Sequence, residues 1–493
     1  MHKTFPKLLI AAAVASTFAS AFAMPAHAAG NETIVKRHFA SLVAGGQPKL
    51  AELTMFFTMM PKGGDLHHHY SGAIYAEQFL DWVDREKYCV NKATYRIETD
   101  PALNAAQRGL AAKDRGCLTG ADVLLDNTVL AEVLQRWATK DFYNHSGQQN
   151  PPDRTFFDTF PYFGPVSSTN TADGLRTLKQ RAINENVAYI ETVFEIAPLA
   201  QYADFDRAVL APGADLHAHF ESLMASLDKD AGWNGWLAAY DANVNTSSAG
   251  IDDARFTMRY QPFVLRFLSP SQVFSGMVSG FKLARQNPKI VGVNIVGQES
   301  THVSMRDYTL HMRMFAFLKK KFPEVNLSLH AGELALGMVP PEGLQSHIAE
   351  AVHTAGAARI GHGMDIAHER NAPGLLKAMR DKNIPVEVNL TSNEFILGIK
   401  GEQHPVTVYR KYGVPFILAT DDAGVSRNNL SNEYVLFASR YKTDYAEVKK
   451  LSYDSIRYAF LPNGDKQRLL KSLDARFAQF EADVAAALHS AKK

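Results

Sequence analysis

The 493-residue chain lacks several features that mark large classes of protein. It has only two cysteines, Cys89 and Cys117, too few for a cysteine-rich zinc site or for the Pro-Cys-x-x-Cys motif of cytidine deaminases. It contains no Gly-Lys dipeptide, and so no phosphate-binding P-loop, and no Gly-x-Ser-x-Gly nucleophile elbow. These absences exclude P-loop nucleotidases and serine hydrolases of the elbow type.

The chain also lacks an excess of charge of either sign. Lysine and arginine total 52 against 51 acidic residues, which gives a formal net charge of +1. Loss of residues 1–28 would remove Lys3 and Lys7 and no acid, and would leave a charge of −1. Because nucleic acids and anionic membranes select strongly basic proteins, we expect neither as a partner.

The long apolar run of the sequence lies close to its beginning. Lys3 and Lys7 precede an apolar stretch at residues 8–23, and Ala26-His27-Ala28 offers small residues for cleavage. This pattern predicts an export signal at residues 1–28, and hence a periplasmic or secreted protein, rather than a membrane helix. In an oxidising compartment the two cysteines are candidates for a disulfide, with two reduced buried thiols as the alternative.

From residue 186 onward, short β-branched runs alternate with amphipathic stretches. Such alternation is typical of parallel strands joined by crossover helices. We expect strands at residues 187–194, 259–267, 290–296, 325–330, 359–362, 385–390 and 415–420. With a strand at residues 65–69 they make up the eight of a (β/α)8 TIM-type barrel, and a doubly wound open sheet is the competing architecture.

The remaining segments are interpreted as additions to this barrel. Residues 88–150 are polar and irregular and contain both cysteines, so we predict a disulfide-pinned insertion after the first strand, helical at residues 123–140. A short amphipathic helix capped at Asn31 should precede the barrel, and further helices should follow residue 432. We expect residues 29–493 to form a single domain.

Three consecutive histidines end the first predicted strand. Side chains alternate along a strand, so His67 and His69 share one face and His68 points to the other. Two imidazoles one pleat apart can bind the same divalent ion. The alternative is a histidine-rich surface turn.

Other polar residues follow the ends of later predicted strands. His330 ends the fifth strand and precedes Glu333, His362 ends the sixth, and Asp421 and Asp422 follow the eighth. In a barrel, catalytic groups gather at this end of the strands. Any one of them can be a buried core imidazole or a solvated acid, but jointly they favour a mononuclear metal site with an open coordination position.

The motifs around these residues resemble those of the adenosine deaminases of the amidohydrolase superfamily. They are Leu66-His67-His68-His69, His330-Ala331-Gly332-Glu333, Gly361-His362-Gly363 and Thr420-Asp421-Asp422, in order over roughly residues 60–430. The opening Met60-Pro61-Lys62-Gly63-Gly64 is similar to the secreted branch, the adenosine deaminase-related growth factors. The resemblance implies one zinc ion per chain, bound by His67, His69, His330 and Asp421.

The resemblance also implies roles in the hydrolytic deamination of adenosine and 2′-deoxyadenosine to inosine and ammonia. Glu333 would protonate N1 of the purine, His362 would orient or deprotonate the attacking water, and Asp422 would bind N7. The alternatives are an amidohydrolase acting on another aminopurine or a cyclic amide, and an inactive exported metal-binding or signalling protein.

The resemblance identifies only some of the residues that would contact the substrate. The backbone N–H of Gly297 would reach N3 of the purine, and Phe156 and Phe157 resemble an apolar lid, although core packing explains them equally well. Tyr70-Ser71 stand where the family often has an aspartate near the ribose 5′-hydroxyl, and Ser71 could donate a hydrogen bond there. Val193 stands where we expect an arginine. Ribose recognition and the oligomeric state, including a homodimer, therefore stay open.

Overall fold

The computed structural model describes residues 26–140, 142–143 and 150–490. The predicted export signal lies largely outside these residues and remains a prediction. Among the helices described, none combines the length and apolar character that crossing a membrane requires.

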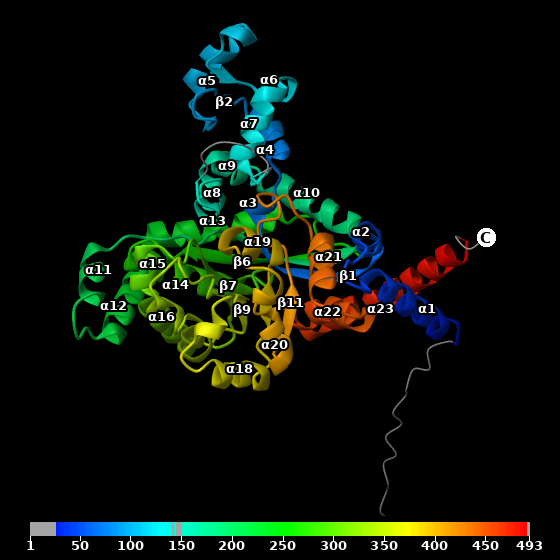
Figure 1. Ribbon diagram of the computed structural model, residues 1–493. Helices are drawn as coiled ribbons and strands as arrows, with labels where there is room; N and C mark the ends of the chain where they lie inside the picture. The colour runs from blue at the N-terminus through cyan, green and yellow to red at the C-terminus, as the bar shows by residue number, and fades with distance from the viewer. Residues whose placement is uncertain (1–25, 141, 144–149, 491–493) are drawn as a thin grey trace, which may run out of the picture.

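Eight parallel strands form the centre of the molecule (Figure 1). They are β1 (Lys62–His69), β5 (Val187–Ile196), β6 (Thr257–Leu265), β7 (Gly292–Val296), β8 (Asn326–Ala331), β9 (Arg359–His362), β10 (Val386–Val388) and β11 (Phe416–Leu418). Each pairs with its neighbour in chain order, and a bridge between His68 and Asp421 joins the last strand to the first. The prediction of a (β/α)8 barrel is confirmed, because an open sheet would leave β1 and β11 unpaired.

The barrel interior contains a buried ion network that the sequence did not reveal. The Arg359 guanidinium lies 2.5 Å from Glu191 on one side and 2.5 Å from Glu387 on the other. All three side chains are buried, and Tyr189 and Gln261 donate further hydrogen bonds to Glu191. Because a buried carboxylate needs a partner, this arginine is what allows two acids to occupy the barrel core.

Helices cover the outside of the barrel and extend beyond its last strand. Those that cross between strands include α10 (Thr171–Asn184), α14 (Pro270–Gln286), α16 (Tyr308–Lys321), α18 (Ala372–Asp381) and α20 (Val406–Tyr412). The predicted C-terminal additions are α21 (Leu430–Arg440), α22 (Tyr445–Arg457) and α23 (Asn463–Ser490). The helix α1 (Ala26–Val43) packs against α23 (Figure 1). The cap predicted at Asn31 is wrong, because α1 already begins at Ala26.

The insertion after the first strand projects from the barrel as a separate lobe (Figure 1). It is more regular than predicted: β2 (Cys89–Asn91), β3 (Ile97–Glu98) and β4 (Cys117–Leu118) form an antiparallel sheet flanked by α5 (Pro101–Arg108). The Cys89–Cys117 disulfide joins β2 to β4 and confirms the pinned insertion. The helix predicted at residues 123–140 is divided into α6 (Gly120–Leu125) and α7 (Asn127–Trp137), because Asp126 caps the second helix with its side chain.

Candidate metal centre

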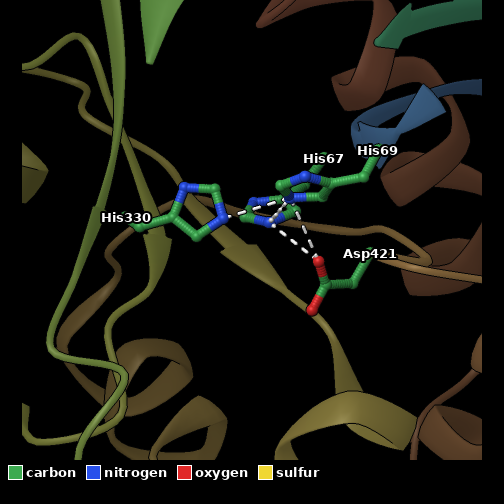
Figure 2. Close-up of side chains that lie close together, drawn as sticks. All are labelled: His67, His69, His330 and Asp421. Carbon is green, nitrogen blue, oxygen red and sulfur yellow. Dashed lines mark hydrogen bonds and ion pairs between the residues drawn. The ribbon is translucent and has the colours of Figure 1, made fainter. Parts of the chain in front are cut away.

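Four residues from three strand ends bring their ligand atoms together, as Figure 2 shows. One ligand atom each of His67, His69, His330 and Asp421 lies within 4.8 Å of the others. His69 Nε2 is 3.1 Å from His330 Nε2 and 3.4 Å from His67 Nε2. Asp421 Oδ1 lies 3.3 Å from Nε2 of both His67 and His69. The four predicted ligands therefore converge on one point, whereas the His68 ring turns away to Thr192 Oγ1 at 3.0 Å.

Hydrogen bonds on the far side of two imidazoles aim their Nε2 atoms at this point. His67 Nδ1 donates to Glu387 Oε2 at 2.7 Å, and His330 Nδ1 donates to Asn294 Oδ1 at 2.9 Å. Burial alone would raise the pKa of Glu387, but Arg359 and His67 outweigh it and hold the pKa at about 2. Fixing Nδ1 as the protonated nitrogen leaves Nε2 free to ligate. These two imidazoles, with that of His69 and the carboxylate of Asp421, fit a divalent ion of the zinc type.

Glu333 lies beside this cluster, with Oε1 3.7 Å from His362 Nε2. Its backbone is fixed by Glu299, which accepts the N–H groups of Gly332 at 3.1 Å and Glu333 at 3.0 Å and pairs with Arg266 at 3.1 Å. Burial, with the negative charges of Asp421 and Glu299, raises the pKa of Glu333 well above its usual value. A raised pKa favours the protonated form of the carboxyl group, which can donate a proton.

Asp422 also faces the site. It is buried, and its Oδ1 has no hydrogen-bond partner among the described residues. Burial and the neighbouring Asp421 raise its pKa well above the usual value. The pKa values of the two adjacent aspartates thus shift in opposite directions: the hydrogen bond and charge of His67 lower that of Asp421 despite burial, whereas that of Asp422 is raised.

A chain of hydrogen bonds fixes the ring of His362. The Val406 N–H donates to His404 Nδ1 at 3.1 Å, so His404 carries its proton on Nε2 and donates to Asn393 Oδ1 at 3.2 Å. The amide of Asn393 is thereby oriented, and its Nδ2 donates to His362 Nδ1 at 3.0 Å. Burial lowers the pKa of His362 to about 3. His362 is therefore neutral with its proton on Nε2, the nitrogen that faces Glu333 and Asp421.

Two of these residues have strained backbones. His362 (φ 66°) and Asp421 (φ 59°) lie in the left-handed region that residues other than glycine rarely adopt. His362 ends β9 and Asp421 lies three residues beyond β11, so both strained residues lie at strand ends that carry the cluster. Backbone strain of this kind persists where the surrounding structure fixes it, and it is concentrated at functional sites.

A cavity of about 540 Å³ opens above the cluster. The predicted residues that line it are Ser71, Phe156, Phe157, Gly297, Glu333, His362, Asp421 and Asp422, with His69 and His330 at its base. Phe156 is buried and packs edge-on against Phe157 at 5.3 Å, so these rings both line the cavity and pack together. Their role as a lid, like the N3 contact of Gly297, stays a prediction.

Comparison with known proteins bears on this geometry. A family model described as adenosine deaminase matches residues 281–476. Adenosine deaminase from Pseudoalteromonas translucida is 25% identical over 296 residues, which cover 55% of this chain and 88% of the relative. Over these parts of its length the chain is similar to adenosine deaminases. The enzyme from Haemophilus ducreyi is 30% identical over 199 residues, 40% of this chain and 52% of that relative, so this match spans about half of the relative's length.

Solved structures share the barrel fold of this chain. The N6-methyl-AMP deaminase from Arabidopsis thaliana is 20% identical with a TM-score of 0.51, and the likeness covers 86% of this chain and 98% of that one. An amidohydrolase from Burkholderia ambifaria, solved with bound zinc, is 18% identical with a TM-score of 0.51, covering 88% and 94%. At such identities the likeness supports the fold alone. The resemblance to the secreted branch stays a prediction.

Several residues that shape the site were missed by sequence reasoning. Glu387, Asn294, Glu299 and Asn393 each orient a predicted residue through a hydrogen bond. The sequence contains only a weak signal for these supporting residues. A charged or amide residue inside a β-branched run, such as Glu387 between Val386 and Val388, needs a buried partner. The sequence alone does not tell which partner that is.

Proposed function

We propose that this protein is a zinc-dependent adenosine deaminase, which converts adenosine and 2′-deoxyadenosine to inosine and ammonia. One observation carries the proposal: two buried carboxyl groups with raised pKa values, Glu333 and Asp422, face the same cavity as the four convergent ligands. A protein that merely stores a metal needs neither carboxyl group, so an inactive metal-binding protein is disfavoured.

The residues that line the cavity provide groups that match the ring nitrogens and the reacting carbon of an aminopurine. A divalent ion held by the four ligands would activate water as a nucleophile at neutral pH. Glu333, which keeps its proton, donates it to N1 and makes the ring carbon C6 electrophilic. Asp422 hydrogen-bonds N7 through its own proton.

His362 orients the attacking water. The hydrogen-bond chain through Asn393 leaves the His362 proton on Nε2, and a protonated nitrogen donates a hydrogen bond but does not accept a proton. This supports orientation over deprotonation, the two roles that the family resemblance leaves open. Glu333 Oε1 lies 3.7 Å from His362 Nε2, so both side chains can contact the same part of the substrate.

Other purine substrates are the second candidate. Solved structures with this fold include an ADAL protein from Arabidopsis in complex with IMP, at 18% identity. That identity supports no transfer of a nucleotide substrate, whereas the sequence relatives are adenosine deaminases at 25–30% identity. Adenosine is therefore the substrate we test first.

Export and a single functional domain at residues 29–493 belong to the same proposal. The N-terminal pattern of basic residues, apolar run and small residues supports export. The Cys89–Cys117 disulfide is in keeping with an oxidising compartment.

The test is steady-state turnover of adenosine by the purified protein, followed as inosine formation, together with zinc content. We expect activity and one zinc per chain to disappear together on chelation and to return on adding zinc. Asp421→Asn serves as the matched control and should lose both, because it removes a ligand. Zinc-loaded protein that deaminates neither adenosine nor 2′-deoxyadenosine would refute the proposal.

A further inference from the structure

The mouth of the cavity carries an acidic residue that the proposed chemistry does not use. Glu195 lies near the end of β5, is half-buried and lines the cavity. Ser168 Oγ donates to Glu195 Oε2 at 3.3 Å, and no lysine or arginine pairs with this carboxylate among the described residues. A carboxyl group with one weak partner and an open side toward a cavity is available to a ligand.

Strand geometry places Glu195 at the level where a nucleoside carries its sugar. Val193 pairs with the metal-cluster residue His69 in the register of β1 and β5. Glu195 is two residues further along, roughly 6.6 Å toward the mouth at the rise of a strand. A purine whose reacting carbon lies at the metal cluster would bring its ribose to this height. The Tyr240 hydroxyl donates to the Glu195 carbonyl oxygen at 3.1 Å and holds the backbone there.

The described lining of the cavity offers no cationic side chain to bind a phosphate. It includes neither lysine nor arginine, and Glu195 lies near its mouth. Ser71, Ser168, Gln298 and Thr301 add neutral polar groups near the mouth. Proteins bind phosphate with arginine, lysine or clustered backbone N–H groups, and a carboxylate repels it.

We propose that Glu195 binds a ribose hydroxyl and restricts the site to uncharged nucleosides, against nucleoside 5′-monophosphates. This inference rests on the proposed deaminase function and adds a specificity-determining residue to it. The carboxyl group hydrogen-bonds the sugar, and Ser168 steadies it. Burial raises the pKa of Glu195 to about 7, so at an assay pH above this value the group is ionised and its charge disfavours a 5′-phosphate at the same height.

The test combines deletion of the carboxylate with deletion of single hydroxyls. The kcat/KM of wild type and Glu195→Ala is measured on adenosine and on its 2′-, 3′- and 5′-deoxy analogues. Glu195→Ala should lose about 10- to 100-fold on adenosine, the usual effect of a hydrogen bond to a charged group. The loss should fall mostly on KM, and it should vanish for the one analogue that lacks the contacted hydroxyl.

A second variant isolates the charge. Glu195→Gln keeps the size of the side chain. The ratio of kcat/KM for adenosine to kcat/KM for AMP should fall by at least about 10-fold in this variant. Glu86→Gln removes an equal charge from the exposed surface and should leave the preference unchanged. Zinc content and melting temperature establish that the variants are folded.

The outcomes separate the two proposals. Equal losses on adenosine and all three deoxy analogues would overturn the role of Glu195, and so would wild-type protein that deaminates AMP as well as adenosine. Wild-type protein without activity on any nucleoside would instead refute the proposed function itself.

Discussion

Gly72 is the residue whose replacement tests the packing of the site most directly. It lies in the short helix α3 (Tyr70–Ala73) against Asp422, and a Cβ added to it would be 1.5 Å from Asp422 Oδ1 and 2.8 Å from Asp422 Cβ. Rotating the carboxylate relieves the first clash but not the second. Because carbon atoms rest about 3.5 Å apart, the Asp422 Cβ and its backbone would have to move by roughly 0.7 Å.

That displacement is large for a site of this kind. Asp422 is joined to the ligand Asp421, and the Gly72 carbonyl oxygen accepts N–H groups from Gly424 at 2.8 Å and Val425 at 2.9 Å, so the whole turn shifts together. Misplacement by about 1 Å near the reacting groups can cost 10²-fold in rate. We expect Gly72→Ala to lower kcat/KM for adenosine by about 100-fold and stability by about 1–3 kcal/mol, the usual effect of overpacking.

Kinetics, zinc content and thermal unfolding would be measured on Gly72→Ala and on a control. Gly235→Ala in α13 (Ala231–Ser247) is the control, because nothing lies within 4 Å of the added Cβ. It should keep full activity and gain about 0.5–1 kcal/mol from better helix propensity. Wild-type kcat/KM in Gly72→Ala would refute the claim that close contact with α3 sets the position of Asp422.

Four further predictions concern the proton donor, the metal ligands, the disulfide and the orientation of His362. Glu333→Gln should lower kcat by about 10²- to 10⁴-fold with zinc content intact, since the amide cannot supply the proton; near wild-type kcat would contradict the assigned role. His67→Ala should lose most zinc after dialysis and His68→Ala should keep it, so equal loss would argue against the ligand set. The cysteines of the native protein should be unreactive to thiol reagents until reduced, and Cys89→Ser should destabilise the insertion by about 3 kcal/mol while activity persists. Asn393→Ala should lower kcat about 10-fold, with KM and zinc content unchanged, because it frees the ring of His362; a rise in KM alone would indicate a different role.

The barrel and the metal ligands could be predicted because their signals are local. Most barrel strands after β1 lie in short apolar runs, and such runs separated by amphipathic stretches indicate the architecture without knowledge of any contact. His330, His362 and Asp421 each end or follow such a run. Once the barrel is assumed, its geometry brings these strand ends to one rim, and the resemblance to adenosine deaminases then indicates which four residues bind the metal.

The supporting residues could not be predicted because their partners are distant in sequence. Glu387 is 320 residues from His67, and Glu191 is 168 residues from Arg359. No local pattern pairs them. The strands of the insertion are two or three residues long, too short for alternation to be visible, so the lobe reads as irregular.

The barrel seam and the metal centre depend on the same residues. The Asp421 N–H donates to the His67 carbonyl oxygen at 2.8 Å, and the His69 N–H donates to the Asp421 carbonyl oxygen at 3.2 Å, so the backbone that closes the barrel also presents three ligands. The left-handed backbone of Asp421 is unfavourable by itself, as are the buried, protonated carboxyl groups of Glu333 and Asp422. They persist because the surrounding strands are fixed by extensive parallel pairing and by the Arg359 network beneath. The raised pKa of Glu333, on which the proposed protonation of N1 depends, is therefore a property that the closed barrel imposes rather than one that the glutamate has locally.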